Sequence, residues 1–156
     1  MFNTSIIVKL VLVLLFNFLE ASANDITTTI NDFDLRIDKI KNKYFHIRHD
    51  IFSPRNSVST NFNTYSDSLK AISSKLIASR NEIFKKILNQ DLDENYLDKI
   101  SKIELKFRLL NNSISLLLYI NEYYNSTNIN TLSTFRDYKA QIKRLITYEK
   151  LFYEMK

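Results

Sequence analysis

The chain of 156 residues contains no glycine, no cysteine and no tryptophan, and its only proline is Pro54. Without glycine it cannot form the glycine-rich phosphate loops of nucleotide-binding proteins or the sharp turn that exposes the nucleophile of many hydrolases. Without cysteine it has no thiol catalysis, no disulfide bond and no cysteine-based zinc site. These absences exclude several classes of enzyme and metalloprotein.

An apolar segment near the N-terminus predicts export. Lys9 is followed by ten mostly apolar residues at 10–19 and then by a short stretch with small side chains. Within that stretch, Ala21 and Ala23 fit the pattern that signal peptidase requires, so cleavage is expected between Ala23 and Asn24. The apolar run is shorter than the roughly 20 residues of a membrane-spanning helix.

The alternative is an uncleaved anchor built from residues 1–19. It would place Lys9 inside the membrane at a cost of about 3 kcal/mol. We therefore predict a signal peptide at 1–23 and a mature domain at 24–156, secreted and extracellular. Because no disulfide can support this domain, its hydrophobic core must be sufficient alone.

From residue 24 onward, apolar residues follow the three-and-four spacing of amphipathic helices. The sequence predicts helices at about 26–52, 61–89, 92–124 and 131–154. The first has an unbroken apolar seam: Ile26, Ile30, Phe33, Ile37, Ile40, Tyr44, Ile47 and Ile51. The second has Phe62, Tyr65, Leu69, Ile72, Leu76, Ser79, Ile83 and Ile87.

The later helices continue this pattern. The seam of the third comprises Ile100, Ile103, Phe107, Leu110, Ile114, Leu117, Asn121 and Tyr124, and that of the fourth Phe135, Tyr138, Ile142, Leu145 and Phe152. Proline ends the first helix, because the residue before it disfavours the helical conformation. The segment Asp91–Glu94 is interpreted as a capping box that opens the third helix.

Short connections between long helices favour antiparallel neighbours. The predicted fold is therefore all-α, an antiparallel up-down-up-down four-helix bundle with heptad-patterned long helices after an N-terminal signal peptide. The alternative is a long helical hairpin that forms a homodimer through the same seams. The third helix has the widest apolar face, at 116–120, which suggests either the most buried helix or a self-association surface.

Two patterns resemble metal sites weakly. His46 and His49 share a helix face beside Asp50, but they lie off the seam, where solvated histidines favour the helix dipole. The run that begins at Asp91 resembles a calcium loop only at its start, because Tyr96 stands where glycine is needed. We expect no metal and no cofactor. Since no catalytic constellation is recognisable either, we expect no enzyme activity.

Aromatic residues are the best candidates for a binding surface. The predicted bundle would gather ten of them at one end: Tyr44, Phe45, Phe52, Phe62, Tyr65, Tyr119, Tyr123, Tyr124, Phe135 and Tyr138. Phe45, Phe52 and Tyr123 lie off the seams or beside a loop and form the candidate surface. Two sequons offer candidate glycosylation sites, Asn125 in a predicted loop and Asn111 on a helix flank.

The net charge of +5 points to anionic partners. Basic residues recur on the second and fourth helices, but acids are interspersed on the solvated faces, including Asp137 and Glu149. For an exported protein we expect a membrane surface or a polyanion rather than nucleic acid. The leading hypothesis is a secreted, non-enzymatic helical protein that binds a macromolecular partner, most simply a protein. The alternatives are a carrier that binds lipid or an anionic membrane surface, and a coiled-coil component of a self-assembly.

Overall fold

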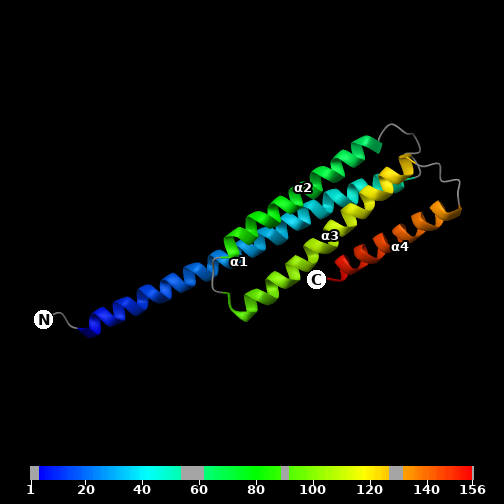
Figure 1. The fold of residues 1–156 in the computed structure, drawn as a ribbon. Helices are drawn as coiled ribbons and strands as arrows, with labels where there is room; N and C mark the ends of the chain where they lie inside the picture. Colours follow the sequence, from blue (N-terminus) through cyan, green and yellow to red (C-terminus); the bar gives the residue numbers. More distant parts are fainter. Residues whose placement is uncertain (1–3, 54–61, 89–91, 127–131, 156) are drawn as a thin grey trace.

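The computed structural model describes the backbone at 4–53, 62–88, 92–126 and 132–155, and side chains at 25–53, 63–88, 92–123 and 135–155. The helices are α1 (Thr4–Phe52), α2 (Phe62–Ile87), α3 (Glu94–Ser126) and α4 (Leu132–Glu154). They pack against one another, and no strand occurs in the described ranges (Figure 1). The predicted all-α fold with four packed helices is confirmed.

Helix α1 begins much earlier than the predicted start near residue 26. It contains 49 residues and includes the apolar N-terminal segment. No proline or glycine separates this segment from the heptad seam, so nothing in the sequence interrupts the helix. Its first part extends past the other helices (Figure 1). The side chains of the predicted cleavage site, Ala23 and Asn24, lie outside the described ones, and the signal peptide stays a prediction.

Local hydrogen bonds mark where helices begin and end. α1 ends at Phe52, and the next amide, that of Ser53, donates to the carbonyl of Asp50 at 3.3 Å. At the start of α3, the Asp93 carboxylate accepts the Tyr96 amide at 3.0 Å. The Asp93 carbonyl accepts the amide of Leu97 at 3.1 Å. Asp93 is therefore the N-cap.

This geometry corrects the predicted capping box. The sequence places Glu94 three residues into the helix, from where its side chain would reach back to a cap at Asp91. In the structure Glu94 is the first helical residue, and Asp91 lies outside the described residues. Both aspartates are competent caps, and the later start leaves Leu92 before the helix, packed against the core.

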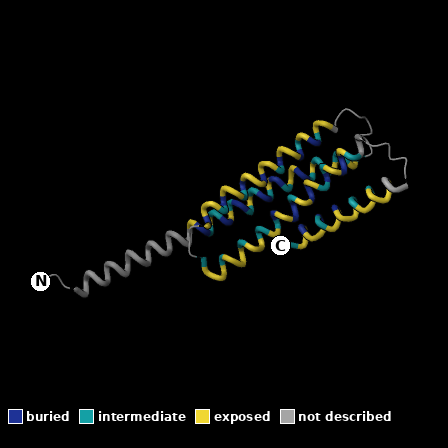
Figure 2. The backbone as a smooth tube through the Cα atoms, viewed as in Figure 1, coloured by how far each residue is buried: buried dark blue, intermediate teal, exposed yellow. Residues whose placement is uncertain are grey.

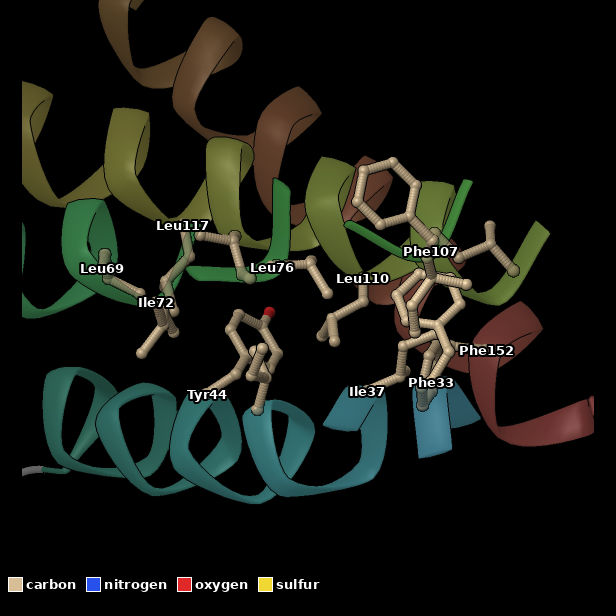
Figure 3. Close-up of a cluster of buried hydrophobic side chains, with 14 of the residues drawn as sticks. Phe33, Ile37, Tyr44, Leu69, Ile72, Leu76, Phe107, Leu110, Leu117 and Phe152 are labelled. Carbon is tan, nitrogen blue, oxygen red and sulfur yellow. The ribbon is translucent and has the colours of Figure 1, made fainter. Parts of the chain in front are cut away.

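The heptad seams of α1, α2 and α3 form most of the core. Ile37, Tyr44, Leu69, Leu76 and Leu117 are completely buried. Figure 3 shows Ile37 and Tyr44 of α1 facing side chains of α2 and α3. Every described seam residue from Ile26 to Tyr44 is buried, as the spacing predicts. The seam residues Phe62 and Tyr124 lie outside the described side chains.

Helix α4 contributes less to the core than the sequence predicts. Leu145 and Phe152 are buried, but Phe135 is 52% exposed, so its predicted core position is wrong. Phe135 and Phe152 are seventeen residues apart, which on a straight helix separates them by about 100°. They cannot both face the same core. Many of the described side chains of α4, at 135–154, are accordingly exposed (Figure 2).

The helices do not contact one another equally. α3 packs against all three others, and α1, α2 and α3 form a mutually contacting group. The backbone of α4 approaches only that of α3, and side chains alone join it to α1. The central position of α3 accounts for the burial of Leu117 and Ile120 within its wide apolar face, whereas Tyr119 in the same face is 47% exposed. Self-association through this face stays a prediction.

Ion pairs give the relative directions of neighbouring helices. Lys70 of α2 pairs with Glu122 of α3, and Arg80 pairs with Glu104. Residue numbers rise along α2 as they fall along α3, so these two helices run in opposite directions. Between α1 and α3, the pair Asp34–Lys106 lies farther along both helices than the contact of Thr27 with Tyr96. These two helices therefore run in the same direction.

Candidate functional site

A buried carboxylate joins α4 to α1. Glu149 is only 7% exposed and lies in the α4 seam between Leu145 and Phe152. One of its oxygens, Oε1, accepts the Tyr44 hydroxyl at 2.6 Å and is also paired with the Arg48 guanidinium. Sequence reasoning placed Glu149 on a solvated face, and that placement is wrong. Its burial could have been predicted from its position in the seam, four residues after Leu145 and three before Phe152.

Tyr44 serves this site as a neutral donor. Burial raises the pKa of its hydroxyl far above the usual value, and the charge of Glu149 raises it further. The tyrosine therefore keeps its proton at all physiological pH values. A buried carboxylate with a hydroxyl and a guanidinium directed at it is a stabilising arrangement for that carboxylate. Its direct consequence is to hold α4 against α1.

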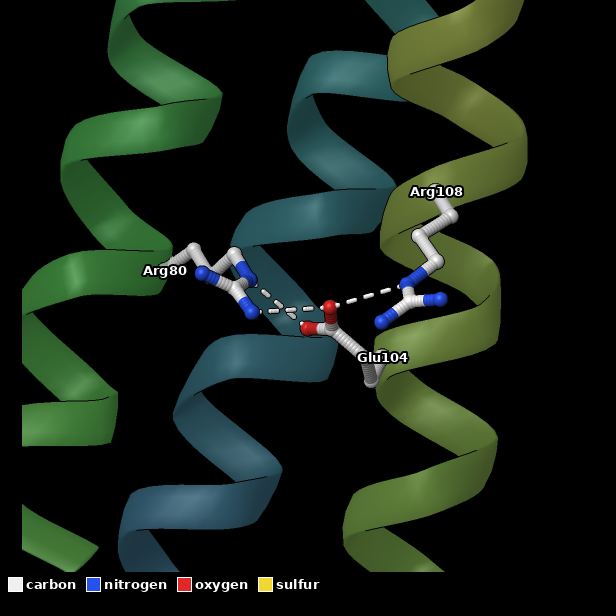
Figure 4. Close-up of polar contacts among 3 residues, drawn as sticks. All are labelled: Arg80, Glu104 and Arg108. Atoms are coloured by element: carbon white, nitrogen blue, oxygen red, sulfur yellow. Dashed lines mark hydrogen bonds and ion pairs between the residues drawn. The ribbon is translucent and has the colours of Figure 1, made fainter. Parts of the chain in front are cut away.

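A second ionic group connects α2 to α3 (Figure 4). Arg80 donates two hydrogen bonds to Glu104, at 2.7 and 2.8 Å, and Arg108 donates a third at 3.1 Å. Burial alone would raise the pKa of Glu104, but the hydrogen bonds from both arginines outweigh it and lower the pKa. The Arg80 guanidinium also lies 4.5 Å from the ring centre of Phe84, so it is held by packing as well as by charge.

A buried polar contact also links α2 to α3. The Asn121 side-chain amide donates to the Ser66 hydroxyl at 2.8 Å, and both residues are buried. A polar residue in an apolar seam favours the one alignment in which its partner is opposite. Asn121 lies in the seam of α3, and its contact with Ser66 favours one register of α2 against α3.

The histidines are solvated. The side chains of His46 and His49 are each 81% exposed and lie 3.8 and 3.6 Å from the Asp50 carboxylate. Over the described ranges, no group of three or more histidine, cysteine, aspartate or glutamate side chains is arranged to hold a metal ion. The expectation that the protein binds no metal stays a prediction.

The three aromatic residues predicted to form a binding surface lie in separate contacts. The Phe45 ring is 5.0 Å from that of Tyr153, whereas Phe52 lies under the Arg48 guanidinium at 5.4 Å. Tyr123 stacks on Tyr119 of the same helix at 5.7 Å. Among the described side chains, no ring contact joins Tyr123 to Phe45 or Phe52. Their role in binding is therefore still a prediction.

The end of the bundle that was predicted to gather aromatic residues differs from the prediction in the part of α4 that contacts Phe45. Phe45 meets Tyr153 from the last turns of α4 rather than a residue from its start. Lys41 lies over the Phe152 ring at 5.9 Å, which places the C-terminal part of α4 beside the C-terminal half of α1. Tyr153 was not among the aromatic residues assigned to this end, because the sequence did not indicate how far α4 is shifted along α1.

The two predicted glycosylation sites have different surroundings. Asn111 is half-buried on α3, and its side-chain oxygen accepts the Ser73 hydroxyl at 3.4 Å. Asn125 belongs to the last turn of α3 rather than to a loop, because this helix continues to Ser126. The side chain of Asn125 lies outside the described ones. Glycosylation of either asparagine stays a prediction.

These observations define an all-α protein with a heptad core and two ionic groups that each join a pair of helices. Over the described residues, no helical stretch has the length and apolar character needed to cross a membrane. Comparison of the chain with protein-family models, curated proteins and solved structures finds no match in any of the three.

Proposed function

We propose that the chain is a secreted, non-enzymatic protein that acts by binding a macromolecular partner, most simply a protein. The observation that carries this proposal is the exposure of large aromatic side chains on a well-packed helical core. Phe52 is 37% exposed, and Tyr119, which stacks on the half-buried Tyr123, is 47% exposed. Aromatic side chains held on rigid elements are typical anchors of protein interfaces.

The two carboxylates held by arginines support a non-catalytic function. Glu149 accepts donors from Tyr44 and Arg48, and Glu104 accepts donors from Arg80 and Arg108. Each carboxylate is thereby engaged by side chains that stabilise the packing of two helices. We accordingly assign both groups to stability.

We further propose that the mature domain, residues 24–156, is an up-down-up-down four-helix bundle formed after removal of a signal peptide. The opposite directions of α2 and α3 support this topology. So does the antiparallel match of α1 and α4, in which Tyr44 meets Glu149 and Lys41 meets Phe152. The Ala21 and Ala23 pattern supports the cleavage.

The experiment combines secretion with partner capture. The tagged chain is produced in a eukaryotic secretory host and used to recover proteins from extracellular fluid of its source, beside the double variant Phe52→Ser/Tyr123→Ser. Recovery of the same discrete protein by the wild type, with loss in the variant, is the expected result. The matched control is Leu88→Ser, which changes an exposed apolar residue directly after the end of α2 (74% exposed). Retention of the chain in the cell, or equal recovery by all variants, would contradict the proposal.

Of the alternatives, a carrier that opens its bundle is less well supported. Ile37, Leu76 and Leu117 have no exposed surface, and their residue types and spacing favour a fixed core over one that opens easily. A self-assembly component would instead share its seams between chains. Mass in solution separates this alternative from a self-contained bundle.

A further inference from the structure

One face of α4 is left uncovered by the rest of the bundle and carries large apolar residues. Phe135 and Ile146 are each 52% exposed. They are eleven residues, or about three turns, apart and therefore lie in one row along the helix. Ile142, half-buried, lies in the same row. At 1.5 Å per residue, the row from Phe135 to Ile146 is roughly 17 Å long.

A row of cations runs beside this apolar row. Arg136, Lys139 and Lys143 follow a three-and-four spacing, and all three are exposed. No ion pair to any of them occurs in the described part of the chain, in contrast to Lys70 on α2, which is paired with Glu122. Their charge is therefore available to an external partner.

The acids of α4 do not neutralise this row. Asp137 lies about 160° around the helix from Lys139, on the opposite side. Glu149 is buried against α1, and Glu154 lies 3.8 Å from Lys150 near the end of the helix. The uncovered face, defined by Phe135, Arg136, Lys139, Lys143 and Ile146, is thus both apolar and positively charged.

The form of this face favours a flat partner over a helical one. It is an open surface, and among the described residues its lining comes from α4 alone, at 136–147. Recognition of an amphipathic partner helix typically uses a hydrophobic groove that receives its apolar face. A lipid surface needs only one exposed amphipathic helix, and α4 lies at the outer edge of the bundle (Figure 1).

We propose that this face of α4 binds the surface of an anionic phospholipid membrane. Arg136, Lys139 and Lys143 contact headgroup phosphates, while Phe135 and Ile146 enter the boundary between headgroups and acyl chains. The helix lies along the membrane surface and does not cross it. This inference goes beyond the proposed capture of a macromolecular partner through aromatic residues of α1 and α3, because it uses another surface and another class of partner.

Co-sedimentation with vesicles tests the proposal. The protein, purified as the expression host produces it, is mixed with one of two kinds of vesicle. One kind contains phosphatidylcholine alone, and the other contains equimolar phosphatidylserine and phosphatidylcholine. We expect binding to the anionic vesicles only, and weaker binding as salt screens the charges. Each lysine near the surface contributes about fivefold, so Lys139→Gln/Lys143→Gln should weaken the partition coefficient about 25-fold. Phe135→Ser/Ile146→Ser should weaken it about tenfold.

The matched control is Lys75→Gln/Lys85→Gln, which removes the same charge from exposed positions on α2. This control should bind anionic vesicles nearly as well as the wild type. Any contribution of the N-terminal segment to vesicle binding is the same in all variants. Equal weakening by the control would indicate an effect of net charge alone and overturn the proposal. Failure of the wild type to bind anionic vesicles at low salt would also overturn it.

Binding to polyglutamate tests the competing hypothesis that the uncovered face binds an acidic protein. Binding to polyglutamate without binding to vesicles would overturn the membrane proposal and assign the face to an acidic protein. Circular dichroism of every variant establishes that the helices are retained. Because the partner-capture experiment uses Phe52 and Tyr123, its outcome is independent of these variants, and either proposal can fail alone.

Discussion

The most informative single residue is Glu149. A carboxylate in an apolar seam is unfavourable unless donors compensate for lost hydration. Tyr44 and Arg48 supply these donors from α1, more than a hundred residues earlier in the chain. Since Tyr44 is itself completely buried, the contact joins the seam of α4 to the centre of the core.

Loss of this carboxylate should destabilise the protein. For Glu149→Ala we expect the free energy of unfolding to fall by about 2 kcal/mol, the scale of hydrogen bonds to a charged group. Glu154→Ala is the control, because Glu154 is exposed and lies 3.8 Å from its lysine, and it should change the value by less than about 0.5 kcal/mol. Urea unfolding followed by circular dichroism measures both. Equal effects of the two substitutions would contradict the structural role of Glu149.

Glu104 should make stability depend on pH in the acidic range. Its pKa is lower in the folded chain than in the unfolded chain, where glutamate titrates near pH 4.3. Its contribution is therefore complete above the unfolded pKa and disappears as the pH falls through the lower, folded pKa. Glu104→Gln should lower stability at neutral pH and flatten its decline below about pH 5. Urea midpoints over a pH series measure this, with exposed Asp137→Asn as the control. An unchanged pH profile in Glu104→Gln would refute the prediction.

Among the helices, the regular seams are what the sequence predicts best. The spacing from Ile26 to Tyr44 identifies buried residues because each helix has one face to bury, and its period is set by local geometry. Even Ser79, a polar residue in an apolar seam, is buried as its position predicts. These elements could be predicted because their pattern repeats over many turns.

The environments of Glu149 and Phe135 could not be predicted, because they depend on how the helices are placed relative to one another. Glu149 looks like a surface residue until Tyr44 and Arg48 are brought beside it, and no local pattern indicates that they are. Phe135 fits the seam by spacing, but it lies about 100° around the helix from Phe152. The face beside Phe135 was recognised in the sequence only as a run of basic residues.

Helix α4 should be the least stable element. Among the described helices, its backbone packs closely only against that of α3, and its outer side carries the exposed residues Phe135 and Ile146. Regions with few buried contacts open at lower free energies than the core. We expect the amides of α4 to exchange hydrogen faster than those of α3, and Leu145→Ala to accelerate exchange in α4 first. Hydrogen exchange with mass spectrometry measures this. Equal protection of α3 and α4 would contradict it.

For the molecule as a whole, the question is whether the buried seams belong to one chain. Ile37, Leu76 and Leu117 come from three different helices and have no exposed surface. A hairpin that dimerises through its seams would leave such residues exposed in a single chain. Their complete burial within one chain favours a self-contained domain.

The corresponding prediction concerns mass and the first residue. From a eukaryotic secretory host we expect a chain that starts at Asn24 and has the mass of one copy, because most of the described seam residues are buried within one chain and Ala21 and Ala23 fit the pattern that signal peptidase requires. Light scattering after size-exclusion chromatography gives the mass in solution, and intact mass spectrometry gives the first residue and any glycan at Asn125. A dimer would mean that a further surface, such as the wide face of α3, joins two chains. A chain that retains residue 1 would contradict export by cleavage, whatever its mass in solution.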